Sequence, residues 1–176
     1  GKAHLEGFRS FEGVIKAKSE LYNYIQKNNG TIFVNNESEL LLELANNINK
    51  ITYGKSGDYT GAISESTPFI SVVFQDEEIK SKLIGDYQFY NIMLAICFGK
   101  HFGVSINNIK TAIENYTPTN NRSQIIETNN NTIILDAYNA NPSSMTAMLY
   151  SFAKQNYQNK LCILGDMLEM GETSLK

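Results

Sequence analysis

The segment from residue 132 to residue 165 places the tightest constraint on the fold of this chain. Two apolar runs, 132–138 and 160–165, flank a helical stretch that begins at Pro142 and continues to about Gln155. Proline suits the first turn of a helix, because the N–H that it lacks would have no partner there. Strand, helix and strand of these lengths predict a βαβ unit, and hence a parallel sheet of the Rossmann kind.

The upstream residues also alternate between helical and extended patterns. Ser10 is an expected N-cap for a helix that runs to about Lys27 and that Gly30 closes. Further elements are expected as a strand at 31–34, a helix at 38–47, a strand at 51–53, one or two strands within 61–74, and helices at 88–102 and 106–116. The whole chain is therefore predicted to be α/β.

A polar, proline-bearing stretch at 117–122 interrupts this pattern and predicts a join between two domains. We expect one domain at 1–120 and a second at 121–176. The sequence opens without a methionine and stops at Lys176 with no obvious terminal element. We therefore expect the chain to be a piece of a longer protein.

Composition excludes several classes of function. With 176 residues, 42% of them apolar and 19% charged, the chain can bury a core and is not a disordered tail. Fifteen basic and eighteen acidic residues give a net charge of -3, which argues against a nucleic-acid partner. No run of eighteen apolar residues is present, so no membrane insertion is expected. Cys97 and Cys162 lie in apolar surroundings, which predicts buried thiols and a reducing, cytoplasmic setting.

Lys18 interrupts the apolar stripe of the first predicted helix. The stripe consists of Phe11, Val14, Leu21, Tyr22 and Ile25. One interpretation is a packed stem whose ammonium reaches water. The other is a desolvated lysine whose neutral amine captures carbon dioxide as a carbamate, which could then bind magnesium. His4, shortly before this helix, is either a structural residue or a metal ligand that would need oxygen partners such as Glu6.

Polar side chains follow the apolar run that ends at Asp136. The carboxyl ends of parallel strands are where α/β sheets bind ligands, and an aspartate there can hold ribose hydroxyls. The alternative for this segment is simple helix capping by Asn139 or Asn141. Asp166, after the next apolar run, could line the same crevice. Arg122, at the domain join, is either a solvated residue or one that stabilises charge on a transferring phosphoryl group.

Two common phosphate-binding motifs are absent from the sequence. It contains neither Gly-x-x-x-x-Gly-Lys-Ser/Thr nor Gly-x-Gly-x-x-Gly. Residues 54–56, Gly-Lys-Ser, mimic the end of a phosphate loop, but they lack the first glycine and a convincing following helix. We do not expect this segment to bind phosphate.

Three stretches carry a resemblance to a known family. They are residues 1–8 with 16–20, residues 83–91, and residues 136–145 with 164–171. They resemble the Mur ligase family, and within it the branch that adds D-alanyl-D-alanine during peptidoglycan synthesis. The third stretch distinguishes this branch from its sister ligases.

The resemblance implies roles for five residues. The lysine that matches Lys18 is carbamylated and helps to hold magnesium, and the histidine that matches His4 is a metal ligand. Asn91 would contact the adenine of ATP, Asp136 would bind its ribose, and Arg122 would approach its phosphates across the domain join.

The resemblance also implies a fold and a reaction. Residues 1–120 would be part of a P-loop-type central domain that lacks the phosphate loop, and 121–176 the start of a Rossmann-like C-terminal domain. With ATP and Mg²⁺, the enzyme would phosphorylate the carboxylate of UDP-N-acetylmuramoyl-tripeptide and join it to D-alanyl-D-alanine. Asn139 and Asn141 are possible substrate contacts. The full-length protein would be a cytoplasmic monomer that serves cell-wall synthesis, cell shape and division.

Departures from the family pattern define the alternatives. The phosphate loop and the glutamate that completes the magnesium site should lie before Gly1, and the D-alanyl-D-alanine pocket largely beyond Lys176, so we expect this chain alone to be inactive. Gln88 and Asn121 stand where asparagine and glycine are usual. One alternative is a non-catalytic remnant that binds a nucleotide or a partner. Another is a folylpolyglutamate-type or cyanophycin-type ligase, which the residues at 138–145 argue against.

Overall fold

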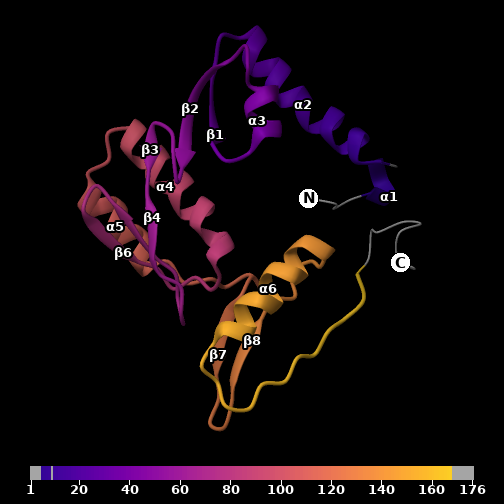
Figure 1. Cartoon of the computed structure of the whole chain (residues 1–176), viewed down its shortest axis with the longest axis vertical. Coiled ribbons are helices and arrows are strands. Elements are labelled where there is room, and N and C mark those ends of the chain that lie inside the picture. Colours follow the sequence, from indigo (N-terminus) through magenta and orange to yellow (C-terminus); the bar gives the residue numbers. More distant parts are fainter. Residues whose placement is uncertain (1–4, 9, 168–176) are drawn as a thin grey trace.

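The computed structural model describes residues 5–8 and 10–167 of the chain. They form an open arc that runs from α2 through α4 to α6 (Figure 1). The helices are α1 (Leu5–Phe8), α2 (Phe11–Lys27), α3 (Glu39–Leu44), η1 (Asp86–Gln88), α4 (Phe89–His101), α5 (Ile106–Asn115) and α6 (Pro142–Lys154). The strands are β1 (Thr31–Asn35), β2 (Asn49–Gly54), β3 (Tyr59–Thr60), β4 (Ala62–Glu65), β5 (Ser71–Phe74), β6 (Glu77–Lys80), β7 (Gln124–Glu127) and β8 (Thr132–Leu135).

The first sheet is parallel and has the order β1–β2–β3. Helices α2 and α3 contact β1, and together they enclose a small core of Ile32, Val34, Ala45 and Ile48. The predicted N-cap of α2 is present, since the backbone N–H of Gly13 donates to Ser10 Oγ at 3.1 Å. At the other end Asn29 takes the left-handed turn, with φ of 51°, and the N–H of Gly30 donates to the carbonyl of Ile25.

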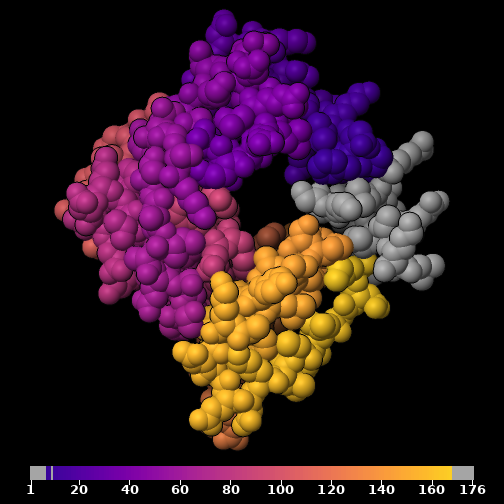
Figure 2. All heavy atoms as spheres, in the orientation of Figure 1, coloured from indigo at the N-terminus to yellow at the C-terminus, as the bar shows by residue number. Residues whose placement is uncertain are grey.

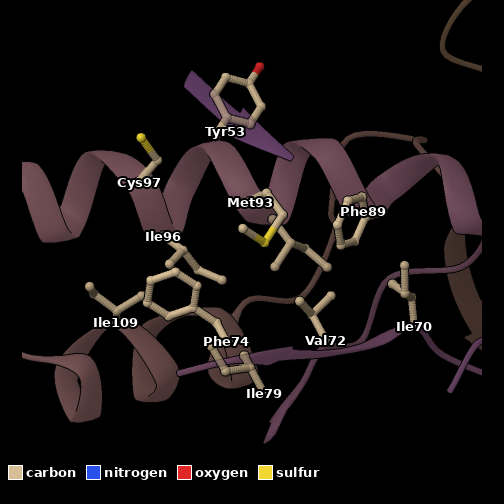
Figure 3. Packing of buried hydrophobic residues seen from close by; sticks show 11 residues of the cluster. Tyr53, Ile70, Val72, Phe74, Ile79, Phe89, Met93, Ile96, Cys97 and Ile109 are labelled. Atoms are coloured by element: carbon tan, nitrogen blue, oxygen red, sulfur yellow. The ribbon is translucent and has the colours of Figure 1, made fainter. Parts of the chain in front are cut away.

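The largest core forms around α4, which lies between two layers. Tyr53 of β2 packs on one side of this helix, and Val72 and Phe74 of β5 lie on the other, towards α5 (Figure 3). Phe89, Met93 and Ile96 of α4 are buried completely. Because α4 is covered on several sides, its sequence is apolar nearly all round.

This core predicts a large effect of truncation at Phe89. Replacing Phe89, which is fully buried, by alanine should lower the free energy of unfolding by about 3–5 kcal/mol, since the transfer energy is lost and a cavity remains. Urea denaturation followed by circular dichroism measures the change. Phe102 is 69% exposed, so Phe102→Ala is the matched control and should cost less than about 1 kcal/mol. Equal losses in the two variants would contradict this core.

The second sheet is antiparallel, in the order β4–β5–β6. The sequence patterns predicted strands within 61–74, which are β4 and β5, but they missed β3 and β6. Strand β6 reads Glu-Glu-Ile-Lys, and Ile79 is its one buried residue. An edge strand with a single inward apolar side chain has too little alternation to be recognised in the sequence.

The C-terminal part differs from the prediction in its sheet. Strands β7 and β8 pair as an antiparallel hairpin, with Ile125 opposite Ile134, and α6 follows. The predicted βαβ unit is wrong for the described residues, because 160–165 form no strand. Leu161 and Ile163 are 80% and 90% exposed. An apolar run becomes a strand only when another strand pairs with its backbone, and within the described part of the chain none lies beside it.

The two cysteines have different environments. Cys97 on α4 is buried, as predicted, and burial raises the pKa of its thiol to about 11. Cys162 is exposed, so the prediction of a buried thiol is wrong there. The cause is again the unpaired segment at 160–165. Among the described residues, no helix combines the length and the apolar character needed to cross a membrane.

Candidate functional site

A cavity of about 830 Å³ lies where the η1–α4–α5 region meets the domain join and the start of α6. Five residues singled out in the sequence line it, namely Asn91, Arg122, Asp136, Asn139 and Asn141. They come from α4, the 117–122 stretch, the end of β8 and the loop before α6. Asn91 and Asn141, which are 50 positions apart in the sequence, thus line the same cavity.

One end of the cavity is apolar. Its lining side chains there are Leu83, Ile92, Ala95, Ala112, Ile113, Tyr116 and Pro118. Asn91 lies in the first turn of α4, where its Nδ2 donates to Gln88 Oε1 at 2.8 Å. A carboxamide offers both a donor and an acceptor. This end therefore suits a flat heterocycle with hydrogen-bonding edges.

The other end of the cavity is polar and is built by the domain join. Arg122 lies between Asn121 and Ser123, which both adopt left-handed backbone conformations with φ of 57° and 50°. The N–H of Ser123 donates to Asp136 Oδ1 at 3.0 Å, and the N–H of Ala137 donates to the carbonyl of Asn121 at 2.9 Å. The join is thereby fastened to the end of β8.

Arg122 lies over an aromatic ring. Its guanidinium carbon is 4.1 Å from the centre of the Tyr138 ring, within the range of a cation–π contact. Tyr138 is 60% exposed and also lines the cavity. The positive charge is therefore held at the polar end of the cavity and remains available to an anion.

The loop before α6 behaves as a helix cap. Asn141 accepts from the N–H of Ser144 at 3.0 Å, and Ser144 Oγ accepts from the N–H of Asn141 at 3.2 Å. The capping alternative for Asn141 is thus present, while exposed Asn139 accepts from the N–H of Ala140. The N-terminus of α6, with Ser143 and Ser144, faces the cavity, and such a terminus attracts anions.

Sequence reasoning missed three residues of this site, which are Tyr87, Ser123 and Tyr138. The Tyr87 hydroxyl lies 2.8 Å from Ser123 Oγ. Burial raises the pKa of Tyr87, and the nearby Asp136 carboxylate adds to this effect, although the hydrogen bond with Ser123 opposes it. Tyr87 is therefore a neutral phenol at physiological pH. Tyr87 lies within the 83–91 stretch that carries the family resemblance, but nothing in that stretch singled it out from its neighbours.

Lys18 is not among the described residues that line the cavity. Lys18 is exposed on α2, and an opening separates the α2 region from the α6 region in the space-filling view (Figure 2). Its predicted apolar stripe is only partly covered, since Val14 is buried but Leu21 is 60% exposed. Within the described residues Lys18 is therefore exposed, and its role as a carbamylated magnesium ligand stays a prediction. His4 lies outside the described residues, so its predicted role as a metal ligand stays a prediction.

The described residues do not fit a magnesium ion. Within 5–8 and 10–167, no group of three or more histidine, cysteine, aspartate or glutamate side chains could hold a metal. Asp166, which was expected to share the crevice, is exposed and is not among the residues that line the cavity in this part of the chain. The described part of the chain therefore offers no cluster of metal ligands beside the cavity.

The turn at residues 54–56, which mimics the end of a phosphate loop, binds a carboxylate of the protein itself. The Glu37 carboxylate accepts from the N–H groups of Lys55 and Ser56, at 3.2 and 3.0 Å, and from Ser56 Oγ at 2.9 Å. These donors stabilise the turn after β2. They agree with the expectation that residues 54–56 do not serve as a phosphate loop.

Two protein-family models match the chain. The Mur ligase middle domain matches residues 1–99, and the Mur ligase glutamate ligase domain matches residues 121–176. The chain belongs to the Mur ligase family. Its fold is that of an α/β chain that matches the middle and C-terminal domains of these ligases.

Individual Mur ligases show the same relationship. The chain is 30% identical to the UDP-N-acetylmuramoyl-tripeptide–D-alanyl-D-alanine ligase of Bacillus subtilis, over 98% of this chain and 39% of that protein. It is 32% identical to the ligase of the same name from Haemophilus influenzae, again over 98% and 39%. The chain thus spans about two fifths of the length of the relatives that it matches.

Solved Mur ligase structures share this fold. A crystal structure of MurF from Acinetobacter baumannii matches 99% of this chain and 40% of its own, with a TM-score of 0.83 and 27% identity. MurF from Thermotoga maritima, solved in complex with ADP, matches with a TM-score of 0.71 at 22% identity. The second similarity supports the fold alone.

Proposed function

We propose that this chain forms the nucleotide-binding join of an ATP-dependent ligase that adds D-alanyl-D-alanine to UDP-N-acetylmuramoyl-tripeptide. The observation that carries the proposal is the cavity in which Asn91, Arg122 and Asp136 meet. Its volume of about 830 Å³ lies within the usual range for small-molecule sites. The relatives named for this reaction align with nearly the whole chain.

The two ends of the cavity suit the parts of ATP. The adenine would lie at the apolar end beside Asn91, whose carboxamide can pair with a heterocycle edge. The Asp136 carboxylate would accept from ribose hydroxyls. Arg122 and the N-terminus of α6 would face the phosphates, since both favour negative charge. We propose a cytoplasmic, monomeric enzyme of cell-wall synthesis.

The reaction itself requires two steps. The substrate carboxylate attacks the γ-phosphorus of ATP, which gives an acyl phosphate and ADP. The amine of D-alanyl-D-alanine then attacks the acyl carbon, inorganic phosphate leaves, and the amine loses a proton. In the first step, phosphoryl transfer depends mainly on positioning and on charge neutralisation, and Arg122 can supply part of both.

The chain alone should bind nucleotide without turnover. Its sequence has no phosphate-loop motif, and the described residues form no acidic metal site. The roles of His4 and Lys18 at magnesium therefore remain predictions from the family resemblance, as does carbamylation of Lys18.

The test is a ligase assay on the protein translated from the complete reading frame that contains this chain. With ATP, magnesium and UDP-N-acetylmuramoyl-tripeptide, addition of D-alanyl-D-alanine should release ADP and phosphate and form the pentapeptide product, detected by mass spectrometry. L-Glutamate replaces D-alanyl-D-alanine in the control. In a second control a folate and L-glutamate replace both peptide substrates, and product from that pair alone would indicate a folylpolyglutamate-type ligase instead.

A second candidate is a remnant that binds nucleotide without catalysis. Such a remnant would use the same cavity lined by Asn91, Arg122 and Asp136. The same assay separates the two candidates, because a remnant would bind ADP but would release no phosphate in the presence of all three substrates.

A further inference from the structure

We propose that Tyr87 is a positioning residue that fixes the domain join, and through it Arg122 and Asp136, in the geometry needed to bind nucleotide. This inference rests on the proposed function of the cavity. It concerns a residue that touches the join rather than the reacting atoms.

Tyr87 connects three parts of the chain through one hydroxyl group. It belongs to η1, just before α4, and its oxygen lies 2.8 Å from Oγ of Ser123, the residue directly after the 117–122 join, and 3.7 Å from Met148 Sδ of α6. Ser123 and Met148 are 2% and 9% exposed. The hydroxyl is thus a polar bridge in largely buried surroundings, where a missing partner is costly.

Gly85 makes this placement of the tyrosine ring possible. It has a φ of 97°, and a Cβ at position 85 would collide with the Tyr87 ring. The absence of a side chain therefore lets the ring lie against the backbone of its own turn. The positive φ of Gly85 and its missing side chain thus direct the Tyr87 hydroxyl towards the join.

The join needs such a partner because its backbone is strained. Asn121 and Ser123, on either side of Arg122, both occupy the left-handed region that non-glycine residues seldom adopt. Three hydrogen bonds oppose relaxation, which are Ser123 N–H to Asp136, Ala137 N–H to Asn121, and Ser123 Oγ with Tyr87. The last of these is the one that ties the join to the η1–α4 region.

Loss of the Tyr87 hydroxyl should therefore affect both the Ser123 side chain and the backbone around Arg122. Ser123 Oγ would lose a buried partner, and the backbone around Arg122 could leave its strained conformation. Asp136 would then lose the Ser123 N–H that orients its carboxylate. The residues that face the nucleotide would be less ordered before it binds, and part of the binding energy would be spent on ordering them.

The first experiment measures the join without any ligand. In Tyr87→Phe, amide hydrogen exchange at Ser123 and Ala137 should accelerate about three- to tenfold. The amide of buried Ala45 should keep its rate and so reports intact folding. Tyr90→Phe is the control, because Tyr90 packs its ring against Phe89 in the core. Unchanged exchange at Ser123 and Ala137 would overturn the proposal.

The second experiment measures the consequence for binding, by calorimetric titration with ADP. Tyr87→Phe and Ser123→Ala should each weaken binding about three- to tenfold, and the double variant should be no weaker than the weaker single variant. Additive losses would overturn the proposed connection through Ser123. If the unaltered chain does not bind ADP, the proposed function fails, while the exchange measurement still decides whether Tyr87 holds the join.

Discussion

Replacing Arg122 by alanine should lower phosphoryl transfer by the complete ligase about a hundred- to a thousandfold, while ADP affinity falls by less than about tenfold. The reason is its position at the polar end of the cavity, where its guanidinium rests on the Tyr138 ring at 4.1 Å. A fixed charge there contributes most when negative charge is being transferred. Single-turnover formation of ADP from ATP measures the rate of this step.

Two variants sharpen this prediction. Arg122→Lys keeps the charge but loses the planar, two-pronged donor set, so an intermediate rate is expected. Lys82→Ala removes a nearby exposed cation whose Nζ lies 3.5 Å from Thr117 Oγ1, and it should leave the rate unchanged. Full turnover in Arg122→Ala would contradict a role for Arg122 at the phosphates.

Replacing Asp136 by alanine should weaken ADP binding by about ten- to a hundredfold. The change removes a charged acceptor for ribose hydroxyls and also leaves the Ser123 N–H without its partner. Asp136→Asn retains an acceptor for that N–H but loses the charge. Its affinity for ADP should therefore lie between those of the unaltered chain and of Asp136→Ala. Calorimetric titration with ADP measures the affinities.

A modified nucleotide isolates the contribution of the ribose. The unaltered chain should bind 2′,3′-dideoxy-ADP more weakly than ADP, whereas Asp136→Ala should bind the two nucleotides about equally. Asp166→Ala, which removes an exposed carboxylate after the next apolar run, is the control and should keep the preference for ADP. Persistence of that preference in Asp136→Ala would show that the ribose binds elsewhere.

The long helices were predictable because local signals mark them. The Ser10 cap, the proline at 142 and the apolar periodicity placed α2, α4, α5 and α6 to within about three residues. The strand expected at 160–165 failed for a different reason. Its residues favour burial, but a strand also needs a neighbouring backbone, which the local sequence does not specify.

The candidate site was also partly predictable from local sequence signals. Asp136 and Arg122 were marked by the end of an apolar strand and by the domain join, and the structure brings both to one cavity with Asn91. Tyr87 and Ser123 were not, because their importance arises from a contact between residues 36 positions apart. For Lys18, the helical pattern showed which face of α2 favours burial, not whether other residues cover that face.

The most direct test of the nucleotide site is a titration of this chain with ADP, followed by two-dimensional NMR of the backbone amides. The proposed site predicts saturable one-to-one binding, with shifts concentrated at Asn91, Arg122, Asp136 and the first turn of α6. Val34 and Ala45, in the separate core beneath α2 and α3, should not shift. Absence of saturable shifts at the cavity residues, or shifts centred on the turn at 54–56, would contradict it.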